Sequence, residues 1–329
     1  IEWTFFCNLT IHYHYFKSWA NKLKFLQLYY FSIQAFNMKI KKFMKSFLAC
    51  LMFVSSVCHS RTSKTILVTG ASSGIGLSIC QKLLLHPEKF HILMGCRDVK
   101  KGKNAIKSMM KGPGQVQIVE LDVTNDIHIE NLSNTIKKNF SAELYACVNN
   151  AGVGLDLPFQ SFPVTQDSAR KTINANFYGP VKVTEAILPY LNEGGRIINM
   201  SSRSGSRNLG KMTEELRLEM LKDKNPLILK EYGESFIRTF EEIYSENGPS
   251  ILPIQKNGFW LQSYGFSKAL LNLWTVWLAE QKPKITINSC SPGMVLTRMT
   301  QDYKSTDKIR SIEDSIDFLI WLICGDLKG

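Results

Sequence analysis

The stretch "KTILVTGASSGIG", residues 64–76, decides the fold of this chain. Its first half, 64–70, is a short apolar run with β-branched residues that stops at a glycine, which predicts a buried strand. Glycines follow at Gly70, Gly74 and Gly76. They allow a tight turn whose backbone N–H groups can approach an anion at the start of a helix. The sequence therefore predicts a strand, a phosphate-binding turn and a helix over about 75–86.

The same alternation of strand and helix continues outward from this stretch. Helices are expected after the second strand, where the chain is rich in lysine, and over about 127–139. The five further predicted strands are 91–96, 116–123, 143–152, 195–202 and 285–293. Buried strands alternating with helices predict an α/β fold, a doubly wound parallel sheet covered on both faces. Ligands bind such sheets at the carboxyl ends of the strands, so the chemistry is expected there.

Charge and cysteine content exclude several classes of function. The chain of 329 residues has a net charge of +12, but residues 1–64 hold nine basic side chains and one acidic one, so most of the excess lies there. The remainder is nearly balanced, which argues against nucleic acid as a partner. The eight cysteines form no C-x-x-C pair and no metal-ligand spacing with histidine. No metal site and no disulfide framework are expected.

Two segments precede the predicted domain. Residues 1–37 begin with Ile and precede the first methionine, Met38, so we interpret them as a non-native or untranslated leader. Residues 38–60 join a basic start to the apolar run 47–57, which is typical of a signal peptide or a short anchor. The alternative is an N-terminal helix without a targeting role. The run is too short to span a bilayer, and membrane association is expected only through this segment.

Localisation follows from the same segment. The protein is expected to be cytoplasmic if residues 1–60 are not a true leader, and otherwise in the secretory pathway or membrane-associated.

"SYGFSKAL", residues 263–270, places Tyr264 and Lys268 four residues apart, on one face of a predicted helix. A tyrosine with a pKa of about 10 is a poor acid–base group at neutral pH, and an ammonium one turn away favours its ionised form. Such a pair is common by chance, so the rest of the chain must support a catalytic interpretation.

Four motifs occur together and in order: T-G-x-x-x-G-I-G at 69–76, N-N-A-G at 149–152, Y-x-x-x-K at 264–268 and P-G-x-x-x-T at 292–297. With them the chain resembles the short-chain dehydrogenase/reductase family over about 64–328. "CRD", "NFYGP" and "RIINMSS" make it most similar to the monomeric NADPH-dependent carbonyl reductases of that family. The resemblance implies a Rossmann-type fold and an NADPH-dependent oxidoreductase.

The resemblance also implies catalytic roles. Tyr264 would donate a proton to the substrate oxygen, and Lys268 would tune the tyrosine and hold the ribose of the cofactor. Ser202 would orient the substrate carbonyl, with its neighbour Ser201 as the alternative.

The fourth catalytic residue that the resemblance implies is Asn176, which would hold a water that links Lys268 to solvent. Asn174 is the nearby alternative, and an amide that only satisfies local backbone would look the same in the sequence.

The end of the second predicted strand indicates the cofactor. Arg97 matches the position that contacts the 2′-phosphate of NADPH in the family, and Asp98 is expected to cap the next helix. A solvent-facing Arg97 is the alternative. NADPH as cofactor sets the expected direction towards reduction. Besides Tyr264, Lys268 and Arg97, the residues expected to bind it are Gly70, Ser72, Ser73, Gly74, Ile75, Gly76, Asp122, Val123, Asn150, Ala151, Gly152, Pro292, Gly293 and Thr297.

A long insertion precedes the Tyr264 helix. It covers about 203–262, longer than a connection requires, and its periodicity predicts two amphipathic helices. In the family such an insertion covers the surface used for pairing, so a monomer is expected. The stripe predicted to dock on the helix that continues after Lys268 comprises Leu216, Met220, Leu221, Ile228, Leu229, Phe236, Ile237, Phe240 and Ile243. Residues 64–329 are interpreted as a single domain, truncated at its C-terminus because family members continue with one more strand.

The expected activity is therefore NADPH-dependent reduction of a ketone, an aldehyde or a quinone to an alcohol, with a small-molecule carbonyl compound as the partner. A dehydrogenase of steroid or retinoid alcohols is the first alternative. An inert NADPH-binding regulatory module is the alternative from another class.

Overall fold

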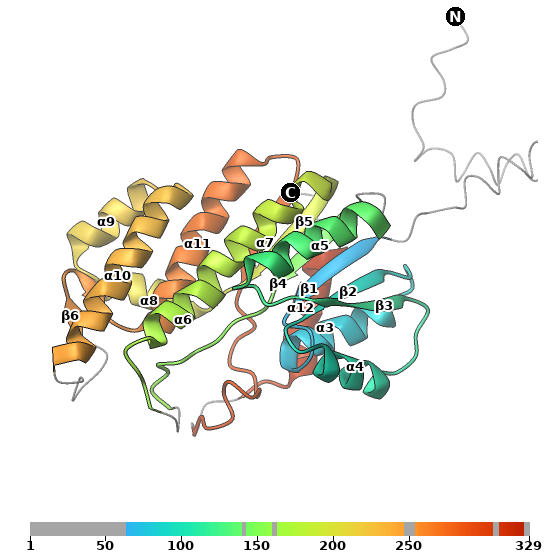
Figure 1. Cartoon of the computed structure of the whole chain (residues 1–329), viewed down its shortest axis with the longest axis horizontal. Coiled ribbons are helices and arrows are strands. Elements are labelled where there is room, and N and C mark those ends of the chain that lie inside the picture. The colour runs from blue at the N-terminus through green and yellow to red at the C-terminus, as the bar shows by residue number, and fades with distance from the viewer. Residues whose placement is uncertain (1–63, 140–142, 160–162, 247–253, 305–308, 326–329) are drawn as a thin grey trace, which may run out of the picture. The chain divides into compact units, whose positions relative to one another are not determined.

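A computed structural model describes residues 64–139, 143–159, 163–246, 254–304 and 309–325 (Figure 1). The predicted leader 1–37 and the predicted signal or anchor 38–60 lie outside these residues. Within the described ranges, no helix has both the length and the apolar character needed to cross a membrane.

The described residues form a six-stranded parallel sheet with the order β3-β2-β1-β4-β5-β8 (Figure 1). The strands are β1 (Thr65–Thr69), β2 (His91–Cys96), β3 (Gln115–Glu120), β4 (Leu144–Asn149), β5 (Leu191–Met200) and β8 (Thr286–Cys290). This order confirms the predicted doubly wound sheet. It reverses between β1 and β4, so the crevice that such sheets use for ligands lies where these two strands end.

Helices cover both faces of the sheet because successive side chains of a buried strand point to opposite sides. Ile66 and Val68 pack into the core under one set of helices, whereas Leu67 packs under the other. The first set is α3 (Gly74–Leu84), α4 (Val99–Ser108) and α12 (Ile312–Cys324). The second set is α5 (Asp126–Asn139), α6 (Ser168–Ile173), the π-helix η1 (Asn174–Tyr178), α7 (Gly179–Ile187) and α11 (Ser263–Gln281). The short 3₁₀ turn η2 (Leu188–Tyr190) leads into β5.

The third to sixth strands have other bounds than predicted. β4 ends at Asn149 rather than at 152, and β8 ends at Cys290 rather than at 293. β3 ends at Glu120 rather than at 123, because Asp122 turns the chain by accepting the backbone N–H of Thr124 at 2.9 Å. β5 begins at Leu191, which pairs with Leu144 ahead of the apolar run from which the strand was predicted.

The insertion folds into helices and a hairpin. The helices are α8 (Arg203–Leu209), α9 (Glu214–Lys222) and α10 (Pro226–Glu246), and the hairpin strands are β6 (Gln255–Lys256) and β7 (Phe259–Trp260). Phe236 of α10 stacks on Phe266 of α11, with ring centroids 4.2 Å apart and 6° between the planes. Most of the predicted docking stripe is buried or half-buried, but Leu221 is 43% exposed and its placement in the stripe was wrong. α9 presents a narrower apolar side than its sequence suggested.

Candidate active site

Tyr264 lies in the first turn of α11 with its side chain half-buried. Burial raises the pKa of Tyr264, and a side-chain hydrogen bond with Ser202 opposes the shift only in part. The sequence favoured the opposite direction, a pKa lowered by Lys268. Burial dominates because it removes water from the phenolate, the charged form of the group. A raised pKa keeps the phenol protonated at neutral pH, which is the state that a proton donor needs.

Lys268 lies one turn further along α11 and is only 5% exposed. Its Nζ atom donates a hydrogen bond to the backbone oxygen of Met200 at 2.7 Å and lies 5.8 Å from the centroid of the Tyr264 ring. Burial lowers the pKa of Lys268 to about 8. The ammonium is therefore retained at neutral pH, fixed at the end of β5, with further N–H donors for a ligand.

The structure distinguishes the two candidate serines. Ser202 follows the end of β5, begins α8 by accepting the N–H of Ser204 at 3.1 Å, and reaches Tyr264 with its hydroxyl. The Ser201 hydroxyl is buried, and among the described residues it has no hydrogen-bond partner. The position beside Tyr264 favours Ser202 as the group that would orient a carbonyl.

Asn176 lies in the π-helix η1, with both ends of its side-chain amide engaged. Its Oδ1 accepts the N–H of Val153 at 2.8 Å, and its Nδ2 donates to the Val153 oxygen at 2.7 Å and to the Ser267 hydroxyl at 3.0 Å. The residue four positions on is Pro180, which has no N–H to bond the Asn176 carbonyl in the usual helical way. Both N–H groups of the Asn176 side chain are used within the protein, and the relay water at Asn176 stays a prediction.

The glycine-rich turn fits a bound phosphate group. Gly70 and Gly74 have φ angles of +65° and +56°, which favour glycine, and a Cβ atom at Gly76 would lie 2.5 Å from Nδ2 of Asn150. Ser73, at the N-cap of α3, makes no side-chain capping bond, and the first turn of α3 has no acidic residue. The backbone N–H groups of the first turn of α3 can therefore bind an anion. The other predicted residues of this turn, Ser72 and Ile75, lie within the same loop.

Asn150 ties the end of β4 to this turn. Its Nδ2 donates to the backbone oxygens of Thr69 at 2.9 Å and of Gly70 at 3.3 Å. The Thr69 hydroxyl accepts the backbone N–H groups of Asn150 and Ala151 at 3.0 and 2.9 Å. Asn150 therefore shapes the turn with its side chain. The hydroxyl of Thr69 also shapes the turn. Thr69 was not predicted as a site residue, because in the sequence it resembles any other residue of the strand.

Arg97 and Asp122 meet at the carboxyl ends of β2 and β3. Their closest side-chain atoms, Nε of Arg97 and Oδ2 of Asp122, are 3.9 Å apart, and the Arg97 side chain is 78% exposed. Asp98 accepts the N–H of Lys101 at 2.9 Å, which confirms the predicted helix cap. Val123 is buried against Gly179. An exposed guanidinium whose ion pair with Asp122 is as long as 3.9 Å can bind a phosphate.

The loop after β8 approaches the glycine-rich turn from the other side. A Cβ atom at Gly74 would meet the Thr297 methyl group at 3.7 Å. Gly293 has a φ of +83°, which lets the chain turn after Pro292. Gly152, in the loop after β4, lies close to two predicted catalytic residues. A Cβ atom there would be 3.0 Å from Oδ1 of Asn176 and 3.7 Å from Nζ of Lys268. The loop after β4, which also holds the glycine-rich turn through Asn150, therefore adjoins the predicted catalytic side chains.

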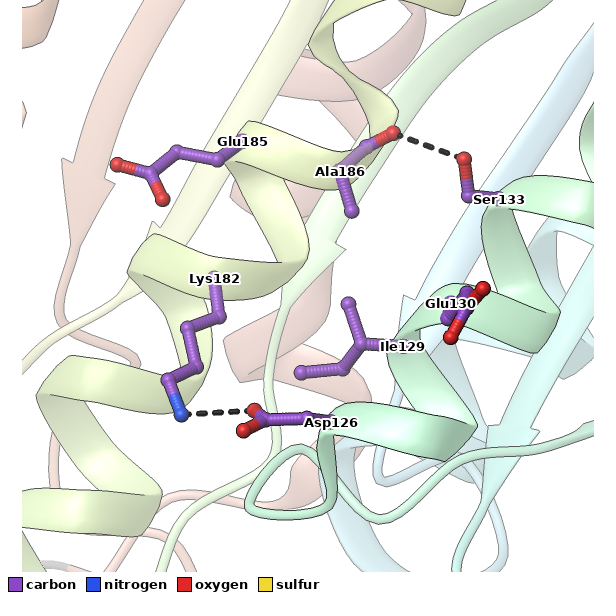
Figure 2. A pocket seen from close by; sticks show the side chains of 7 residues that line it. All are labelled: Asp126, Ile129, Glu130, Ser133, Lys182, Glu185 and Ala186. Atoms are coloured by element: carbon purple, nitrogen blue, oxygen red, sulfur yellow. Dashed lines mark hydrogen bonds and ion pairs between the residues drawn. The ribbon is translucent and has the colours of Figure 1, made fainter.

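A surface pocket lies away from these residues, between α5 and α7 (Figure 2). Its lining residues are Asp126, Ile129, Glu130, Ser133, Lys182, Glu185 and Ala186. Lys182 donates to Asp126 at 2.7 Å, and Ser133 donates to the Ala186 oxygen at 3.4 Å, so contacts between the two helices cross it (Figure 2). None of the predicted site residues lines this pocket.

Comparisons with known proteins agree with the fold. The family model described as short chain dehydrogenase matches residues 64–213. A short-chain dehydrogenase/reductase 1 from Saponaria officinalis is 30% identical over 258 residues, which cover 70% of this chain and 81% of that protein. The chain belongs to the short-chain dehydrogenase family and is an oxidoreductase.

Particular relatives are similar to this chain over most of their length. Salutaridine reductase from Papaver bracteatum is 31% identical over 267 residues, covering 70% of this chain and 82% of the relative. Carbonyl reductase (NADPH) 3 from Rattus norvegicus is 28% identical, covering 80% and 91%. The solved structure of salutaridine reductase from Papaver somniferum aligns with a TM-score of 0.65 at 26% identity, over 81% of this chain and 97% of that one.

Proposed function

We propose that the protein reduces a ketone, an aldehyde or a quinone to an alcohol with NADPH. The observation that supports this most is the half-buried Tyr264 phenol, hydrogen-bonded to Ser202 with Lys268 one turn away. The names of two similar proteins, salutaridine reductase and carbonyl reductase (NADPH) 3, point in the same direction.

Bound NADPH would supply the hydride that adds to the carbonyl carbon. The hydroxyl of Ser202 donates a hydrogen bond to the carbonyl oxygen and so fixes the substrate beside Tyr264. Negative charge develops on that oxygen, and the Tyr264 O–H donates its proton to it, which gives the alcohol. The Lys268 ammonium then stabilises the phenolate, and a proton from solvent restores the phenol.

The residues fit NADPH at three places. The N-terminus of α3 with Gly70, Gly74 and Gly76 would hold the pyrophosphate, because its N–H groups face outward and its glycines admit close approach. Arg97 would bind the 2′-phosphate. Lys268 would donate to the ribose hydroxyls with the N–H groups that Met200 does not use.

The test is spectrophotometric and uses the full chain. NADPH and NADH consumption is followed with a panel of quinones, aldehydes and bulky ketones, and NADP⁺ reduction is followed with steroid and retinoid alcohols. We expect turnover of carbonyl compounds with NADPH. Turnover of the alcohols alone would favour the steroid or retinoid alternative, and cofactor binding without any turnover would favour the regulatory module.

A further inference from the structure

Asp156, on the loop after β4, is a buried carboxylate that the catalytic residues do not include. It is 9% exposed, and its two oxygens accept two successive backbone N–H groups at the start of α11. Oδ1 accepts the N–H of Tyr264 at 3.1 Å, and Oδ2 accepts that of Ser263. Gln262 satisfies the next N–H, that of Gly265, at 2.8 Å. Asp156 therefore reaches across from another element to fix the backbone of the tyrosine itself.

The loop that carries Asp156 is held at its other end by Asn176. The side-chain amide of Asn176 bonds both the N–H and the oxygen of Val153, and it also bonds the Ser267 hydroxyl. Ser267 donates in turn to the backbone oxygen of Tyr264 at 2.8 Å. These hydrogen bonds connect the loop after β4 to α11 at two points. Asp156 binds the backbone N–H of Tyr264, and Ser267 binds the backbone oxygen of Tyr264.

We propose that Asp156 is a positioning residue, which orients Tyr264 towards the substrate by anchoring the first turn of α11 to the loop after β4. The proposal rests on the proposed function, since it assumes that Tyr264 is the proton donor. A carboxylate suits this place because it accepts bonds at both oxygens and donates none. Asparagine keeps the shape but offers one acceptor, and alanine offers none.

The surroundings of Asp156 give the role a pH dependence. The groups that face it are the hydroxyl and the N–H of Ser263 and the N–H of Tyr264, all from α11, and the Tyr244 phenol from α10. Burial raises the pKa of Asp156, and the bonds from Ser263 and Tyr264 oppose the rise. The charge of Asp156 helps to raise the pKa of Tyr244, after burial. A protonated Asp156 has one acceptor fewer, so the anchor weakens as the pH falls through its raised pKa.

The experiment compares Asp156→Asn and Asp156→Ala with Asp126→Asn, which removes an exposed carboxylate from the surface pocket of Figure 2. Hydrogen exchange is measured at the start of α11, and kcat and KM are measured with NADPH and a bulky ketone. We expect faster exchange at residues 263–265 in both Asp156 variants. We expect kcat to fall roughly tenfold in Asp156→Ala and roughly threefold in Asp156→Asn, with KM for NADPH unchanged within about twofold. Asp126→Asn should match the wild type.

The pH profile of kcat separates positioning from simple stability. The wild type should lose activity on the acid side, and Asp156→Asn should lack this limb because its side chain does not titrate. If Asp156→Asn unfolds at a lower temperature but keeps the wild-type kcat and its acid limb, Asp156 only stabilises the fold. If the Asp156 variants exchange faster at 263–265 but the wild type reduces no carbonyl compound, the anchoring role of Asp156 is supported and the proposed function is rejected. Unchanged exchange together with unchanged kcat would reject the positioning role alone.

Discussion

At the scale of single residues, Tyr264 is the group on which the proposed chemistry depends. Tyr264→Phe removes the proton donor but keeps the ring, so we expect less than about a tenth of the wild-type kcat. NADPH affinity should stay nearly unchanged, because the phenol acts on charge that develops during the reaction. Stopped-flow turnover and fluorescence titration with NADPH measure the two quantities. A variant that keeps most of its kcat would show that another group donates the proton.

Arg97 tests the choice of cofactor. Arg97→Ala should raise KM for NADPH by roughly tenfold or more, since a hydrogen bond to a charged group contributes about 1.5–3 kcal/mol. KM for NADH should change little, because NADH lacks the 2′-phosphate. Lys107→Ala, which removes an exposed cation from the last turn of α4, the helix that follows Arg97, is the matched control. Equal effects of Arg97→Ala on the two cofactors would mean that the guanidinium does not bind the phosphate.

Lys268 links catalysis to stability through its pKa of about 8. The folded value lies below the unfolded one, so the group favours folding above the unfolded pKa of 10.5 and loses that contribution as the pH falls through about 8. At pH 7 the buried charge therefore opposes folding, by roughly 3 kcal/mol. Lys268→Met should be inactive yet melt at a higher temperature than the wild type at pH 7.

The gain of Lys268→Met should shrink as the pH rises towards 10. Thermal melts across this pH range provide the measurement, with Lys282→Met, an exposed lysine that ends α11, as the control. A gain that does not depend on pH would mean that packing, and not the buried charge, is responsible.

The candidate site shows what a sequence can and cannot predict about single residues. Tyr264, Lys268 and Ser202 stand in motifs with fixed local spacing, and the structure brings them together. Asp156 was missed because it acts on residues more than a hundred positions away and has no local pattern. The raised pKa of Tyr264 was also missed, because burial depends on packing that no short motif encodes.

At the scale of elements, α10 docks on the core through a glycine. A Cβ atom at Gly233 would lie 2.4 Å from the Tyr178 hydroxyl, which bonds the Lys230 oxygen and Glu234 of α10 at 3.1 Å each. Arg170 of α6 adds bonds to Glu234 and Glu241 on the same helix. Alanine usually favours a helix by about 1 kcal/mol over glycine. Here we expect the close contact with Tyr178 to reverse that preference.

Gly233→Ala should therefore lower the free energy of unfolding by about 1–3 kcal/mol, through overpacking. The double variant Tyr178→Phe/Gly233→Ala should regain part of the loss, because it removes the hydroxyl that the methyl group meets. Gly210→Ala is the control, since its nearest atom lies at 3.5 Å. Denaturant unfolding compares the four proteins. A neutral Gly233→Ala would mean that α10 moves aside at little energetic cost.

Elements within the insertion differ in how far the sequence predicts them. α9 and α10 follow from apolar spacing, whereas the hairpin β6–β7 was not predicted. Its turn is Asn257-Gly258, with φ angles of +49° and +82°, a pair typical of tight hairpins. The flanking strands have only two residues each, which is too few for a periodic signal. The π-helix η1 was also missed, because a bulge inside a helix leaves no spacing of its own.

At the scale of the whole molecule, the covered face of α11 bears on assembly. Phe236 and Phe240 of α10 pack with Phe266 and Leu270 of α11 in one buried cluster. Burial of each such side chain contributes about 1.5–3 kcal/mol, so this intramolecular contact should outcompete pairing through the same surface. We expect a monomer in sedimentation velocity at micromolar concentration. A dominant dimer or tetramer would locate the pairing surface elsewhere or show that α10 undocks.

The strand order of the sheet also has a consequence for synthesis on the ribosome. β1 pairs with β2 and β4, so the strands that lead into the glycine-rich turn, Arg97 and Asn150 are all made before the insertion is translated. β5 waits for β8, and Tyr264 is made between them. The nascent chain thus holds the part of the proposed nucleotide site that follows β1, β2 and β4 well before Tyr264, and Lys268 and Thr297 are added later. Cellular NADPH that binds this half-built sheet would stabilise it by mass action, and the cofactor would assist the folding of its own enzyme.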